Sequence, residues 1–173
     1  ENIDADVCIS GNPETIKNST HIVLPGQGAF ETCIKGLEGI PGMIDELNNS
    51  VINKKKPFLG ICVGMQLLAE EGRENGNHNG LGWIKGSTKK LKPSNLKLPH
   101  MGWNLAIPTN SKYNNLISDK NDYYFVHSYY FDCANRDNIL AETKYGTNFA
   151  SIVGKENIYG VQSVSYTHLT LPT

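Results

Sequence analysis

The sequence predicts one α/β domain, a three-layer arrangement with a mostly parallel central sheet and an antiparallel extension. Two short apolar segments, 21–24 and 57–61, are each followed by a glycine-containing turn and then a helical pattern, as in βα units. The last third instead carries strand-like segments separated by hairpin-like turns. A length of 173 residues suits one domain with a real core.

Composition argues against several classes of protein. The net charge is −1, and no excess of Lys and Arg indicates a nucleic-acid partner. No apolar run approaches the roughly 18 residues of a membrane span, and no signal-peptide pattern opens the chain. Cys8, Cys33, Cys62 and Cys133 are too scattered for a zinc site or a disulfide framework. We therefore expect no metal, no cofactor and a cytoplasmic location.

The remaining elements are expected in the following order. Strands are predicted at 5–9, 81–86, 87–91, 105–107, 123–130, 139–143, 148–153 and 158–162, with hairpin turns at 145–147 and 154–157. Helical segments are predicted at 13–17, 29–37 and 43–54, and an exposed loop at 70–80. We expect the 81–91 region to extend the main sheet with antiparallel strands.

The stretch 56–70 predicts a buried strand, a sharp turn and an amphipathic helix. Cys62 lies at the change of period, with Gly60 and Gly64 two residues to either side. This is the nucleophile-elbow pattern with cysteine in place of serine. The helix N-terminus would favour the thiolate, and the Val63 backbone N–H could face an oxyanion. The alternative is a buried structural cysteine in a βα turn.

Two further segments could bind a ligand or a partner. In Pro25-Gly26-Gln27-Gly28, glycines let backbone amides approach a ligand, although a βα turn could need them for geometry alone. The segment 99–104 combines histidine and tryptophan beside a glycine, which suits a surface with one apolar and one polar side. Its alternative is a tryptophan packed on the sheet, with His100 hydrogen-bonded in a turn.

Four segments in order resemble a known family. The segments 24–30, 60–68, 99–104 and 123–130 together are similar to class I, triad-type glutamine amidotransferases, in the branch of the glutaminase subunits of imidazole glycerol phosphate synthase. The resemblance runs from the first residues to Gln162. It implies a flavodoxin-like fold, of which we expect the first strand and helix to be missing from this chain.

The resemblance also implies roles for particular residues. Cys62 would be the nucleophile, and the amides of Val63 and Gln27 would hold the oxyanion. The residues implied to contact glutamine are Gly26, Gly28, Gln66, Ser128 and Tyr129. Those implied to dock a synthase partner are Pro99, His100, Met101, Gly102, Trp103 and Asn104.

The implied reaction is hydrolysis of glutamine to glutamate and ammonia without a cofactor. The ammonia would be channelled to a cyclase partner of (β/α)8-barrel form in a heterodimer. There it would yield imidazole glycerol phosphate and an aminoimidazole carboxamide ribonucleotide, in histidine biosynthesis. Free ammonia is largely protonated at neutral pH, so an enclosed path would preserve the nucleophile.

The pattern departs from the family after Gln162, where Phe-His-Pro-Glu is expected. Val164 stands in place of the base histidine and Tyr166 in place of the glutamate that orients it. His168 lies four residues late without an acidic partner. We therefore expect an incomplete glutaminase domain at 1–162, a tail at 163–173 that does not match the family, and no glutaminase activity in this chain.

Three other functions remain open from the sequence. A paralogous glutaminase could feed another synthase, for example in surface-sugar biosynthesis. A non-catalytic interaction domain would explain the absent triad members. A hydrolase of the cysteine-peptidase-like branch would need a histidine directly after the elbow cysteine, and Val63 stands there.

Overall fold

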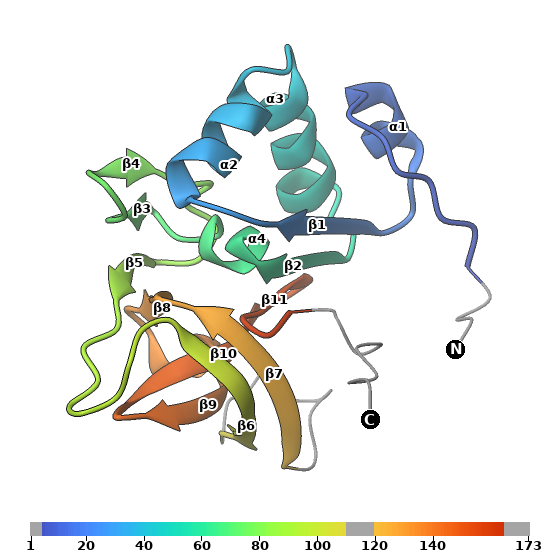
Figure 1. Cartoon of the computed structure of the whole chain (residues 1–173). Helices are drawn as coiled ribbons and strands as arrows, with labels where there is room; N and C mark the ends of the chain where they lie inside the picture. The colour runs from blue at the N-terminus through green and yellow to red at the C-terminus, as the bar shows by residue number, and fades with distance from the viewer. Residues whose placement is uncertain (1–4, 110–119, 165–173) are drawn as a thin grey trace, which may run out of the picture.

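The computed structural model describes residues 5–109 and 120–164, which form two sheets and a group of helices (Figure 1). The larger sheet has the strand order β1-β2-β11-β10-β9-β6-β7, and the smaller has the order β4-β3-β5-β8. The strands are β1 Ile22–Gly26, β2 Phe58–Cys62, β3 Glu71–Gly72, β4 His78–Asn79, β5 Gly86–Lys90, β6 His100–Pro108, β7 Asn121–His127, β8 Tyr129–Cys133, β9 Ile139–Tyr145, β10 Thr147–Lys155 and β11 Ile158–Val161. The helical segments are α1 Pro13–Asn18, α2 Phe30–Glu38, α3 Met43–Asn48, η1 Asn49–Asn53, α4 Val63–Gln66 and η2 Arg136–Asn138.

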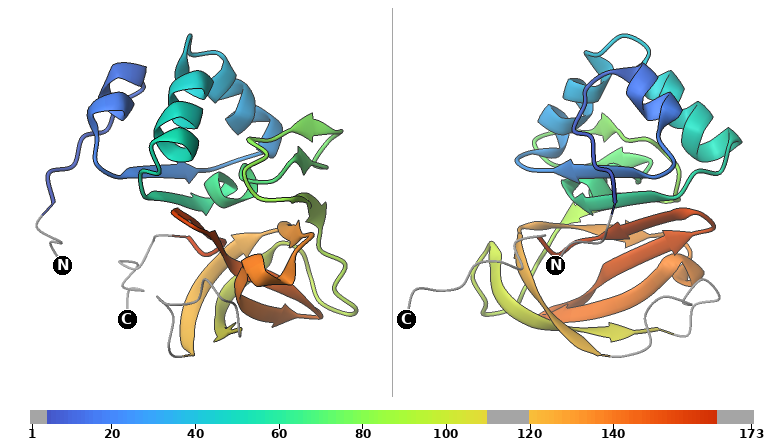
Figure 2. Two further views of the ribbon diagram at one scale, coloured as in Figure 1. Left: turned by 180° about the vertical axis from the view of Figure 1, so that it is seen from behind. Right: turned by 90° about the vertical axis from the view of Figure 1, so that its right-hand side faces the viewer.

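The larger sheet joins a parallel part to an antiparallel extension, as expected, but the antiparallel part is the longer one, so the sheet is not mostly parallel as predicted. β2 pairs in parallel with β1 on one side and with β11 on the other. The pairs from β11 through β10, β9 and β6 to β7 are all antiparallel. The parallel part is thus confined to three strands. Figure 2 shows the antiparallel strands curving away beneath it.

The helices α1, α2 and α3 lie together on one side of β1 and β2, opposite the curved antiparallel strands (Figures 1 and 2). Met43, Leu47 and Val51 recur at four-residue spacing and are buried against the sheet residues Phe58 and Ile158. The spacing predicted this apolar face, although the helix changes from α to π geometry at Asn49.

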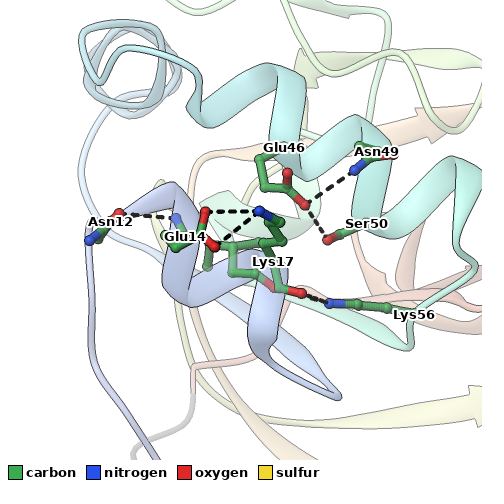
Figure 3. Close-up of polar contacts among 8 residues, drawn as sticks. Asn12, Glu14, Lys17, Glu46, Asn49, Ser50 and Lys56 are labelled. Carbon is green, nitrogen blue, oxygen red and sulfur yellow. Dashed lines mark hydrogen bonds and ion pairs between the residues drawn. The ribbon is translucent and has the colours of Figure 1, made fainter.

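Polar contacts hold α1 against the rest of the fold (Figure 3). The Asn12 side chain caps the helix by accepting from the Glu14 backbone N–H at 3.0 Å. At the other end, the Lys56 ammonium donates to the Ile16 and Lys17 carbonyls at 3.2 and 2.6 Å. Lys56 therefore satisfies the carbonyls of a neighbouring helix, and Ile16 packs on the core as expected.

Two predicted elements differ in the structure. Residues 5–12 form no strand, and Ile9 is 99% exposed because no neighbouring strand covers it. The helix after Cys62 ends at Gln66 instead of continuing to residue 70. The carbonyls of the next two residues are taken by a following loop, since the backbone N–H groups of Leu81 and Ile84 donate to Leu67 and Leu68.

The 70–91 and 123–130 regions also depart from the predictions. Short strands β3 and β4 interrupt the expected loop, and residues 81–85 form no strand. β5 pairs with β3 and β8 in the smaller sheet, so it does not extend the main one. The single strand expected at 123–130 is divided at Ser128, whose carbonyl accepts from Leu91 as the chain passes from β7 to β8.

Candidate active site

Cys62 stands at a sharp turn between β2 and α4, with φ 56° and ψ −113°. A positive φ is uncommon for any residue with a side chain and marks the strained backbone of an elbow. The flanking glycines make the turn possible by close packing. A Cβ on Gly60 would lie 2.5 Å from the Gly64 carbonyl oxygen, and one on Gly64 would overlap the Leu24 carbonyl.

The 25–28 loop lies directly beside this turn. Gly26 is the register partner of Cys62 across the parallel pair β1–β2. A Cβ on Gly26 would come within 2.6 Å of the Gly64 backbone nitrogen, so only glycine lets the two turns meet. Gln27 and Gly28 follow at the exposed end of the strand, where Gly28 has φ +94° and open space beside its Cα.

The Cys62 thiol is half-buried against an apolar cluster of Phe30, Ile34, Val63 and Leu67. Burial raises its pKa above the ordinary value, and the Val63 backbone N–H opposes this only in part. The Val63 N–H at the start of α4 thus acts in the expected direction, towards the thiolate, but α4 is only four residues long and the effect of burial is larger. The thiol needs a base to ionise near neutral pH.

Gln66 extends from α4 into a buried group of polar contacts near the thiol. Its Nε2 donates to the Tyr129 carbonyl and to the Gln162 side-chain oxygen, both at 3.1 Å. The Gln162 Nε2 in turn lies 3.9 Å from the Cys62 sulfur. Cys62, Gln66 and the start of β8 at Tyr129 are thus brought together from separate parts of the sequence.

Sequence reasoning missed the role of Gln162 beside the sulfur. It is fully buried directly after β11, the strand that pairs with β2. The signal that the sequence offered was its position at the end of the strand predicted at 158–162. The pairing of that strand with the elbow strand is seen in the structure. Cys33 was also missed: its thiol donates to the Gln27 carbonyl at 3.3 Å, and it packs with Cys62 on the same apolar cluster.

Residues 100–104 lie on β6 directly after Pro99, and they alternate between two faces of the sheet. Met101 and Trp103 are 61% and 59% exposed, opposite Val126 and Tyr124 of β7. Pro99 is also exposed, while Gly102 and Asn104 are half-buried. His100 is only 2% exposed, which corrects the expectation that all six residues share one docking surface.

Other predicted positions are placed as follows. Val164 is half-buried, and its backbone N–H donates to the Tyr124 carbonyl at 3.1 Å. Tyr166 and His168 lie outside the described residues. Within 5–109 and 120–164, no group of three or more His, Cys, Asp or Glu side chains is arranged to hold a metal ion. No helix in these ranges is long and apolar enough to cross a membrane.

Comparison with solved structures supports the fold. A crystal structure of a glutamine amidotransferase superimposes with a TM-score of 0.65 at 15% identity, covering 89% of this chain and 75% of that one. A glutamine amidotransferase from Thermotoga maritima gives a TM-score of 0.58 at 18% identity, covering 85% of this chain and 56% of that one.

Sequence comparison identifies the family. The model of the class I glutamine amidotransferases matches residues 2–163. The subunit HisH of imidazole glycerol phosphate synthase from Zymomonas mobilis is 43% identical over 160 residues, covering 91% of this chain and 74% of that protein. HisH 2 from Methanococcus maripaludis is 44% identical over 162 residues, covering 92% and 79%. The chain therefore belongs to the class I glutamine amidotransferases, among the HisH subunits of imidazole glycerol phosphate synthase.

Proposed function

We propose that this chain is the glutamine-binding subunit of an imidazole glycerol phosphate synthase and that Cys62 is its nucleophile. The observation that carries the proposal is the elbow, which holds Cys62 at φ 56° beside the 25–28 loop. In the reaction, the Cys62 sulfur bonds to the carboxamide carbon of glutamine. The C–N bond then breaks, ammonia leaves with a proton from an acid, and water hydrolyses the thioester to glutamate.

The remaining site residues have supporting positions around that sulfur. The Val63 and Gln27 amides serve as the two donors to the oxyanion. Gly26 lies beside the elbow, and Gly28 lies next to open space. The chain of the substrate fits along these two glycines without meeting a side chain. Gln66, Ser128 and Tyr129 bind the amino-acid end of glutamine, supported by the contact of Gln66 with the Tyr129 carbonyl.

The partner is a cyclase of (β/α)8-barrel form that binds as a heterodimer and receives the ammonia. The exposed apolar face of β6 and β7 supports this part of the proposal. Met101, Trp103 and Val126 are exposed on it, and the Trp103 ring lies edge-on to Tyr124 at 5.6 Å between centroids. Exposed aromatic and methionine side chains are typical anchors of protein interfaces. A synthase subunit of this kind works in the cytoplasm.

The acid–base part of the reaction is missing from this chain. Val164 cannot take a proton from the half-buried Cys62 thiol, and no carboxylate stands at Tyr166 to orient a base. We accordingly infer that residues up to 162 form an incomplete glutaminase domain, that 163–173 are a tail that does not match the family, and that the chain lacks glutaminase activity.

Two measurements test the proposal. Incubation with a chloroketone analogue of L-glutamine should add its mass to Cys62, whereas the D-enantiomer should react far more slowly. An inert interaction domain would react equally with both. In the second, Val164→His with Tyr166→Glu should produce glutamate release from glutamine, and adding Cys62→Ala should abolish it. Release that persists in the triple variant would overturn the role of Cys62.

A further inference from the structure

We propose that His100 and His127 are positioning residues of the glutamine site, joined in a one-way hydrogen-bond chain that fixes the Tyr129 carbonyl and, through it, Gln66. We call this chain, Asn104–His100–His127–Tyr129 carbonyl, the histidine relay. The inference rests on the proposed function in one respect, that Gln66 and Tyr129 contact glutamine.

The two histidines face each other inside the sheet. They are register partners across β6 and β7, and they are 2% and 6% exposed. The His100 Nδ1 lies 3.2 Å from the His127 Nε2, and the His127 Nδ1 lies 2.8 Å from the Tyr129 carbonyl oxygen. At the other end, the Asn104 Nδ2 lies 3.3 Å from the His100 Nε2.

The contacts at both ends fix the direction of every bond. A carbonyl can only accept, so the His127 Nδ1 carries the proton and its Nε2 accepts from the His100 Nδ1. The His100 Nε2 must then accept from Asn104. The Asn104 amide is already oriented for this, since its Oδ1 accepts from the Leu105 backbone N–H at 2.8 Å and its Nδ2 also donates to the Lys144 carbonyl at 3.0 Å.

Both rings must be neutral for this chain to exist. A charged imidazole has no acceptor nitrogen, so protonation of His127 would remove the acceptor of the bond between the rings, and protonation of His100 would remove the acceptor of the bond from Asn104. The surroundings favour neutrality: His100 lies between Phe125 and Tyr145, at 5.0 and 4.0 Å between ring centroids, and Phe149 lies 4.9 Å from His127. Burial among these rings lowers the pKa of both histidines.

The chain ends on an atom of the glutamine site. The Tyr129 carbonyl accepts from the His127 ring and from Gln66, so the ring fixes the position of the acceptor that orients the Gln66 amide. Both Nε2 protons of Gln66 are then used, on Tyr129 and Gln162, which leaves its Oε1 to accept from a ligand N–H. The hydrogen bond from the His127 ring to the Tyr129 carbonyl also spans Ser128, where the chain passes from β7 to β8.

The alternative is that the histidines serve only as packing in an aromatic core. A packing role predicts that their replacement lowers stability without altering selection of glutamine over other reagents. The positioning role predicts a loss of selectivity in molecules that remain folded, because the Gln66 amide is no longer held.

The test compares rates of Cys62 alkylation in the full chain. The selectivity is the rate with the L-glutamine chloroketone divided by the rate with iodoacetamide, which needs no binding site. His100→Phe and His127→Phe keep an aromatic ring but remove the nitrogens, and should lower the selectivity about tenfold, as expected for a lost hydrogen bond. Tyr145→Phe is the matched control, because its hydroxyl bonds to the Lys97 carbonyl outside the relay.

The outcomes separate the two proposals. A wild-type chain that does not prefer the L over the D chloroketone overturns the proposed function. A wild-type chain that does, with unchanged selectivity in folded histidine variants, overturns the relay alone. Long-range ¹H–¹⁵N NMR of the wild-type chain at pH 7 tests the relay even where a variant does not fold. Both rings should be neutral with the proton on Nδ1, and a charged ring or an Nε2–H tautomer at either histidine would contradict the proposal.

Discussion

Gly64 lies directly against the Leu24 carbonyl, so closely that a Cβ on Gly64 would overlap that oxygen. The contact joins the first residues of α4 to the middle of β1, and it explains how the elbow is held at the edge of the sheet. A backbone-to-backbone contact of this kind leaves no flexible side chain that could move aside.

Gly64→Ala should therefore destabilise the fold by about 3 kcal/mol or more, because backbone must move to admit one methyl group. Gly36→Ala is the matched control. Gly36 lies within α2 with open space at its Cβ position, so alanine should stabilise by up to about 1 kcal/mol. Urea denaturation of both variants measures the difference, and equal effects would refute the steric explanation.

Acid should weaken the fold through His127. Its burial lowers the pKa to about 4 in the folded state, against about 6.5 when unfolded. Between these values the unfolded chain binds more protons, so stability is fully present above pH 6.5 and falls as the pH drops towards 4, by up to about 3 kcal/mol. Urea denaturation across this range should show the decline. His127→Phe should reduce the slope, and an unchanged slope in this folded variant would show that His127 is not its source.

The cysteines should react with iodoacetamide in an order set by exposure and pKa. Cys8 is exposed and should react first. Burial raises the pKa of Cys62, so its rate should be low at pH 7 and should still be rising above pH 9. Burial raises the pKa of Cys133 to about 12, so Cys133 should react last. Peptide mass mapping against pH checks the order; a Cys62 rate that levels off at neutral pH would show that its thiol ionises more readily than its burial implies.

The exposed face of β6 should matter for association and little for folding. Met101→Ala with Trp103→Ala should change the free energy of unfolding by no more than about 0.5 kcal/mol per site, because both side chains are largely solvated. The pair should abolish binding to the cyclase subunit in calorimetry. Val23→Ala, an exposed apolar residue on β1, is the control and should leave binding intact.

The sequence alone determined the elbow, the βα units that begin with the strands at 21–24 and 57–61, and the hairpin succession of the last three strands. These features depend on local rules: apolar runs, glycines at fixed offsets and turn residues act over a few positions. It also located Cys62 and the 25–28 loop, because glycines at short offsets mark both turns. The prediction that Val164 takes the place of a histidine came from the family resemblance and from no local pattern.

Only the tertiary structure decided which distant residues meet. The short α4, the separate sheet of β5 and the burial of His100 among Phe125, Tyr145 and Phe149 follow from contacts between segments far apart in sequence. An apolar cluster covers the Cys62 thiol and raises its pKa. This effect outweighs that of the Val63 backbone N–H at the turn, which lowers the pKa. Gln162 reaches that sulfur because β11 pairs with β2, and the pairing of strands this far apart in sequence is set by burial of the whole sheet and by no local pattern.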